Sequence, residues 1–75
     1  MADSSIDSGH IYKVTELVGT SNSSVDDAIN SAVGLAAKSL RHLRWFEVTQ
    51  LRGDIKNGKV AHYQVTLKLG FTLEG

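Results

Sequence analysis

With 75 residues, the chain is long enough for only one compact domain, and a domain of this size buries only roughly 60% of its unfolded surface, so self-association is the expected source of further burial. The absence of cysteine excludes disulfides and thiolate metal sites and fits a reducing compartment. Eight Lys and Arg balance eight Asp and Glu, so the net charge gives no reason to expect nucleic acid or an anionic membrane as a partner.

The first nine residues are small and polar and predict a disordered tail, followed by a single domain over residues 10–75. The tail has neither a basic start nor an apolar run, so we expect no signal peptide, and no stretch of the chain has the length of a membrane span. The histidines at positions 10, 42 and 62 show no i, i+4 pairing, so no metal site is expected. Together these features predict a cytoplasmic protein.

The first ordered element should be a strand over Ile11–Val18, because this run is rich in residues that favour strands. Gly19 and a polar stretch close it, and Ser24 then has the features of a helix N-cap, with Asp27 three residues later in an approximate capping box. The apolar residues that follow recur with helical spacing and predict one helix, whose largely alanine stripe can lie close to a sheet. This stripe consists of Val25, Ala28, Ile29, Ala32, Val33, Ala36, Leu40 and Leu43.

Gly34 lies inside the predicted helix, where glycine costs about 1 kcal/mol relative to alanine, and it therefore indicates a close contact. Asp26 and Asp27 come early in the helix, and a basic cluster comes near its predicted end. This distribution of charge complements the helix dipole. The alternative is that the basic cluster forms a cationic patch that binds a phosphate. The cluster consists of Lys38, Arg41, His42 and Arg44.

Trp45, the only tryptophan, opens a second strand over Trp45–Arg52, which leads through a turn over Gly53–Gly58, with Asn57-Gly58 at its end, into a long final strand. The final strand alternates between an apolar face and a polar face that carries Gln64. If Phe46 in the second strand faces the core, regular alternation places its odd-numbered neighbours on the opposite, helix-free face. The residues expected there are Trp45, Glu47, Thr49 and Leu51.

The predicted fold is α+β, with the order β-α-β-β and a three-stranded antiparallel sheet wrapped around one helix. One face of such a sheet has no cover, and it would carry Trp45, Leu51 and Val60 among polar groups, so we expect oligomerisation through it. From the residues alone, Trp45 is either an interface anchor or a stacking platform for a planar ligand. Gln64 is either a contact of that ligand or a partner in a cross-strand hydrogen bond.

Several short motifs follow one another along the chain: Val18-Gly19-Thr20-Ser21, Asp27-Ala28-Ile29, Leu40-Arg41-His42-Leu43, Trp45-Phe46-Glu47-Val48, Arg52-Gly53, Tyr63-Gln64-Val65 and Gly70-Phe71. In this order and spacing, the chain from about Ile11 to Glu74 resembles the dodecins, which are small flavin-binding proteins. The resemblance implies a hollow homododecamer with flavins bound in pairs at contacts between subunits. It also implies that Trp45 stacks on the isoalloxazine and that Gln64 forms hydrogen bonds with its polar edge.

The chemistry of these side chains is consistent with a flavin ligand. An indole face can stack on an electron-poor ring, and a primary amide offers both a donor and an acceptor. Arg52 matches the position that meets the flavin's phosphate in bacterial dodecins, and a guanidinium suits a phosphate. A solvated arginine at the end of a strand is the alternative interpretation of Arg52. FMN is accordingly the expected ligand, with riboflavin or FAD as alternatives.

Two positions depart from the dodecin pattern. Some bacterial dodecins also bind coenzyme A between subunits, and Lys13 and Arg41 are candidate contacts for it here. Thr72 stands where many relatives have an arginine, and this lost charge counts against coenzyme A. Arg44 replaces an acidic residue that is common just before the tryptophan, which predicts a more positive rim of the flavin site.

The resemblance implies a non-catalytic function: flavin binding, storage and buffering, with quenching of the flavin's photoreactivity by the indole. No catalytic residues are expected, because the adjacent carboxylates of Asp26 and Asp27 point in different directions on a helix and no other acid/base group is convincing. The alternatives are a structural homo-oligomer in which Trp45 only joins subunits, and a small flavin-dependent reductase.

Overall fold

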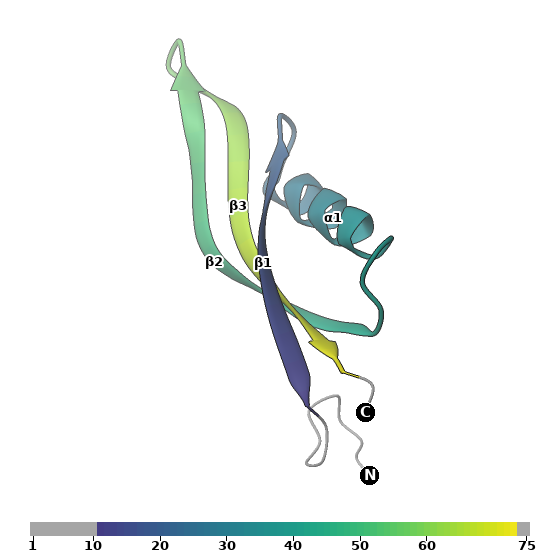
Figure 1. Ribbon diagram of the computed structural model, residues 1–75. Helices are drawn as coiled ribbons and strands as arrows, with labels where there is room; N and C mark the ends of the chain where they lie inside the picture. Colours follow the sequence, from purple (N-terminus) through teal and green to yellow (C-terminus); the bar gives the residue numbers. More distant parts are fainter. Residues whose placement is uncertain (1–10, 74–75) are drawn as a thin grey trace.

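The computed structural model describes residues 11–73, and the predicted tail over residues 1–9 lies outside them. Over the described residues the chain forms β1 (Tyr12–Ser21), α1 (Val25–Ala36), β2 (Leu43–Lys56) and β3 (Lys59–Thr72). The strands form one antiparallel sheet with β3 in the middle (Figure 1). The predicted α+β fold and its β-α-β-β order are therefore confirmed. Within the same residues, no helix combines the length and apolarity needed to cross a membrane.

The helix covers only part of the sheet. Among the described residues, α1 packs on β1 and β3 and not on β2, and the hairpin of β2 and β3 bends and extends past the end of β1 (Figure 1). Gly19 of β1 lets the helix approach, since a Cβ there would overlap the carbonyl oxygen of Ala28 and lie 3.0 Å from the Cβ of Ala32. The predicted alanine stripe thus packs closely on the sheet. The buried apolar side chains are Ala28, Ala32, Val65, Leu67 and Leu69.

The N-terminus of α1 is capped as predicted. Ser24 Oγ accepts a hydrogen bond from the backbone N–H of Asp27 at 3.0 Å. The Asp27 carboxylate accepts from the hydroxyl of Ser21 at 2.7 Å, and the same hydroxyl accepts from the N–H groups of Ser23 at 2.9 Å and Ser24 at 3.3 Å. Ser21, the last residue of β1, is buried, so this network ties the strand to the first turn of the helix.

The C-terminus of α1 differs from the prediction. The helix ends at Ala36, and its last turn contains no basic residue, so the basic half of the predicted complement to the helix dipole is wrong, whereas Asp26 and Asp27 do lie in the first turn. Leu40 and Leu43 continue the apolar spacing by coincidence, because Leu43 packs on the core from β2. Between them, His42 adopts a left-handed conformation (φ 62°), and its carbonyl accepts from the N–H of Thr72 at 3.1 Å. This turn directs the chain into β2.

Gly34 does not mark a close contact. A Cβ at this position would meet nothing within 4 Å among the described residues, so the close contact predicted at Gly34 is absent there. The turn at Asn57 and Gly58 is present as predicted, with φ values of 53° and 75° that suit a tight hairpin, but the longer turn predicted from Gly53 is wrong, because β2 continues to Lys56.

Irregular pairing in β2 changes which side chains share a face. Val48 lies opposite Leu67 and Gln50 opposite Thr66, so the strand contains one extra residue at this point. Beyond it Leu51 lies opposite buried Val65 and shares its face, so the predicted helix-free position of Leu51 is wrong. A single inserted residue reverses the alternation, and the sequence gives no sign of it.

Candidate functional site

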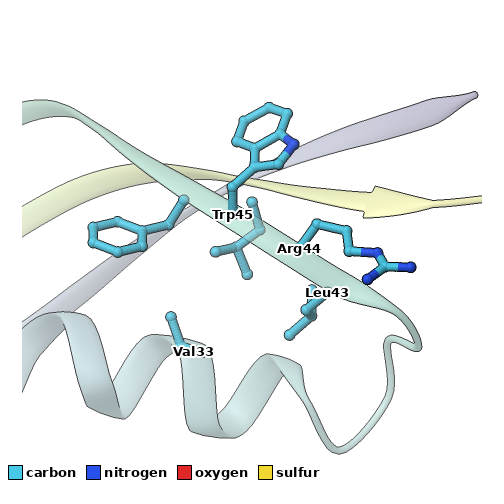
Figure 2. A pocket seen from close by; sticks show the side chains of 6 residues that line it. Val33, Leu43, Arg44 and Trp45 are labelled. Atoms are coloured by element: carbon cyan, nitrogen blue, oxygen red, sulfur yellow. The ribbon is translucent and has the colours of Figure 1, made fainter. Parts of the chain in front are cut away.

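Trp45 lies on the helix-free face of the sheet, as predicted. Irregular pairing at the start of β2 places Leu43 opposite Phe71 and Trp45 opposite Gly70. The two side chains consequently point to opposite faces, and Leu43 packs on the core. Figure 2 shows the indole of Trp45 on the side of β2 that faces away from Val33 of α1.

Gly70 makes room for this indole. A Cβ at Gly70 would overlap Cε2 and Cζ2 of Trp45, so the ring lies directly over the backbone of β3. The indole is half-buried by this contact, and its other face is turned away from the sheet. A large aromatic surface held in one orientation is what a planar ligand requires for stacking.

The indole N–H of Trp45 is buried and has no hydrogen-bond acceptor among the described residues. A buried donor without a partner costs about 1–3 kcal/mol, and such groups are rare in folded proteins. An acceptor supplied by a ligand or by another copy of the chain would remove this cost. The environment of Trp45 is therefore incomplete in the single chain.

Gln64 and Arg52 lie directly opposite each other on β3 and β2. Gln64 is half-buried and Arg52 is exposed. The extra residue between Val48 and Gln50 creates this pairing, because without it Arg52 would point to the other face of the sheet. The structure thus brings an amide and a guanidinium together on the helix-free face.

The structure does not bring Trp45 and Gln64 together within one chain. Trp45 lies opposite Gly70, and Gln64 is six residues earlier on β3, which corresponds to about 20 Å along the strand. This separation exceeds the length of a tricyclic flavin ring. The predicted site residues therefore form two separate groups: the indole half-site, Trp45 over Gly70, and the amide half-site, Gln64 with Arg52.

Lys13 and Arg41 lie at another place in the fold. Lys13 is opposite Phe71 in the pairing of β1 with β3, and Arg41 precedes His42, whose carbonyl binds Thr72. Both side chains are exposed. They are thus close to the end of β3 rather than to the amide half-site.

Arg44 was expected from the sequence to make the rim of the flavin site more positive, but no partner was predicted for it. Its Nε donates to Thr72 Oγ1 at 3.1 Å. Arg44 and Trp45 also line a shallow cavity of about 190 Å³ at the edge of β2 (Figure 2). The other lining residues are Val33, Leu43, Phe46 and Leu69. The change of charge before the tryptophan was visible in the sequence, but the contact with Thr72 depends on the pairing of β2 with β3.

Metal-binding groups are not clustered in the described part of the chain, since no three His, Cys, Asp or Glu side chains there could hold an ion together. His62 Nδ1 lies 3.0 Å from Asn22 Oδ1 in the connection between β1 and α1. This contact ties β3 to the connection.

Residues 11–74 match the family Dodecin. The chain is also 52% identical to the dodecin of Thermus thermophilus over 66 aligned residues. These residues make up 88% of this chain and 96% of that protein. The chain belongs to the dodecin family. Among solved dodecin structures, that from Streptomyces coelicolor matches with a TM-score of 0.84 at 59% identity, covering 92% of this chain and 99% of that chain. Dodecin from Streptomyces davaonensis matches with a TM-score of 0.82 at 47% identity, covering 91% and 100%.

Proposed function

We propose that this dodecin binds and stores a flavin, preferably FMN, without catalysing a reaction. The observation that carries the proposal is the indole of Trp45, which lies over Gly70 on the sheet face that the helix leaves uncovered. A fixed aromatic plane on an open face is suited to stacking, and stacking contributes about 0.5–1.5 kcal/mol beyond the buried area.

The side chains of both half-sites have the chemistry that a flavin needs. The Gln64 amide can donate to and accept from the polar edge of the isoalloxazine. The Arg52 guanidinium can bind the phosphate of FMN, which favours FMN over riboflavin, while FAD also offers phosphate oxygens. A bound flavin supplies a light-absorbing ring, and the indole in contact with it can quench the excited state by electron transfer.

The flavin site takes its two half-sites from different copies of the chain. One ring cannot span the roughly 20 Å of strand between Trp45 and Gln64, whereas two copies whose helix-free faces meet can bring the indole of one near the amide of the other. The buried Nε1 of Trp45, which has no acceptor within the described part of the chain, favours the same arrangement. Membership of the dodecin family implies an oligomeric assembly, and we propose a homododecamer in the cytoplasm.

Coenzyme A is a second proposed ligand, with Lys13 and Arg41 as contacts. Both are exposed cations close to Thr72, which suits a ligand that carries phosphates. Thr72 lacks the charge that many relatives have at this position, so this proposal is subordinate to the flavin site.

Titration of FMN with the apo-protein tests the flavin proposal. We expect fluorescence quenching that saturates near one flavin per chain. Trp45→Ala should weaken binding roughly tenfold to hundredfold, since loss of an aromatic stacking partner typically costs about 1–3 kcal/mol. Trp45→Phe should have an intermediate effect, and Lys59→Gln, a substitution at the exposed hairpin outside both half-sites, should leave the affinity unchanged.

Each competing function gives a different result. Absence of quenching with FMN and riboflavin would favour a structural oligomer without ligand, as would collapse of the oligomer in Trp45→Ala with unchanged flavin affinity. Catalytic oxidation of a nicotinamide cofactor by the flavin-loaded protein would favour a reductase.

A further inference from the structure

Arg44 is anchored beside the indole half-site. Its Nε donates to Thr72 Oγ1 at 3.1 Å, and Thr72 is two residues beyond Gly70 on β3. Side chains two residues apart on a strand share a face and lie about 7 Å from each other. The hydrogen bond therefore holds the guanidinium beside Thr72, which is the next residue after Gly70 on the same face of β3.

The hydrogen bond to Thr72 leaves the two terminal nitrogens of the Arg44 guanidinium available to bind an anion. It engages Nε, and Thr72 is the partner that the structure gives Arg44 among residues 11–73. The two terminal nitrogens of the guanidinium form the fork that binds phosphate in a bidentate manner. A guanidinium that is already fixed loses less conformational freedom when an anion binds.

Charges on the two sides of the indole differ. On one side of Gly70, Lys68 lies between Glu16 of β1 and Glu47 of β2, so two carboxylates accompany one ammonium group. On the other side, Thr72 lies opposite Tyr12 and accepts from Arg44. A phosphate group near the ring is consequently repelled from the first side and attracted to the second.

We propose that Arg44 binds the phosphate of a flavin stacked on Trp45 of the same chain and thereby selects FMN over riboflavin. This inference rests on the proposed flavin function and deepens it. Arg52 belongs to the amide half-site and is therefore contributed by another copy, about 20 Å along the strand from its own Trp45. The phosphate monoester then lies between guanidinium groups of two copies, of which Arg44 is the one next to the ring.

The ratio of the affinities for FMN and riboflavin, both measured by fluorescence quenching, tests this role. Arg44→Gln should lower the ratio about tenfold, as expected for loss of a charge-assisted hydrogen bond at an exposed site, without changing the affinity for riboflavin. Arg44→Lys should retain part of the selectivity. Thr72→Val keeps the charge but releases Nε, so it should lower the ratio less than Arg44→Gln does. Lys59→Gln also removes one positive charge, but at the exposed hairpin, and should leave the ratio unchanged.

The outcomes separate this inference from the function on which it rests. An unchanged ratio in Arg44→Gln, with both flavins still quenched, would overturn the role of Arg44 and leave the flavin store intact. Equal weakening of the binding of both flavins would also overturn the role of Arg44, because the contact with Thr72 would then have a purely structural role. If the wild-type protein quenches neither flavin, the proposed function itself fails.

Discussion

At the scale of single residues, the proposed stacking platform depends on Gly70, a residue without a side chain. Gly70→Ala would place a Cβ inside the volume of the Trp45 indole, so the ring would have to leave the backbone of β3. We expect this substitution to weaken FMN binding at least about tenfold and to destabilise the protein by about 1–3 kcal/mol, the usual cost of overpacking. FMN titration and tryptophan fluorescence, together with a denaturant titration, measure both effects.

Gly34→Ala is the matched control for Gly70→Ala, since a Cβ at Gly34 meets nothing within 4 Å. Flavin affinity should be unchanged in this control. If Gly70→Ala binds FMN as tightly as the wild-type protein, the contact between Gly70 and the indole is not what prepares the stacking surface.

The sequence predicted the sheet face on which Trp45 lies better than it predicted the surroundings of the candidate site residues. The helix-free position of Trp45 was predictable from the alternation of apolar residues around Phe46. The distance between Trp45 and Gln64 was not, because it depends on the register of β2 against β3. The buried Nε1 of Trp45 and the anchor of Arg44 on Thr72 also depend on that register.

At the scale of elements, regular spacing predicted the strands and most of the helix, and it failed where the chain departs from regularity. Leu40 and Leu43 continue the helical spacing, yet the helix ends at Ala36, in a region without the proline or glycine that usually reveals such an end. In β2, the extra residue after Val48 moves Leu51 to the other face and Arg52 next to Gln64. An irregularity of this kind has no sequence signature, although it determines the composition of the amide half-site.

The helix offers a prediction of its own at Gly34, which is exposed and free of tertiary contacts among the described residues. Gly34→Ala should stabilise the protein by up to about 1 kcal/mol, because alanine has the higher helix propensity. Thermal unfolding of both proteins at one fixed chain concentration would measure the difference, since the stability of an oligomer depends on concentration. A lower melting temperature, or loss of the oligomer, would mean that Gly34 contacts another copy of the chain.

At the scale of the whole molecule, the single chain leaves apolar surface on both faces of its sheet. Because α1 packs on β1 and β3, the helix side of β2 remains open, and Phe46, Val48 and Leu51 are 51%, 41% and 56% exposed. The helix-free face carries the indole, whose N–H has no acceptor among residues 11–73. Each subunit of a closed assembly with more than two copies needs more than one contact surface, and two open faces on one small domain meet that requirement.

Mixed oligomers test whether the flavin site takes its halves from two copies. Trp45→Ala chains keep the amide half-site and Gln64→Ala chains keep the indole half-site, and each protein alone should bind FMN weakly. When the two chains are refolded together, some contacts will join an intact indole half-site to an intact amide half-site. We therefore expect FMN quenching to reappear in the mixture and to pass through a maximum at equal amounts of the two chains.

A mixture of Gln64→Ala with Arg52→Ala is the matched control, because both substitutions lie in the amide half-site and no pairing of these chains restores it. Native mass spectrometry would establish that both mixtures contain hybrid oligomers. Hybrids of Trp45→Ala and Gln64→Ala that still fail to bind FMN would mean that one chain supplies both side chains, in conflict with the roughly 20 Å of strand between them. Restored binding would instead make the contact between copies a part of the binding site.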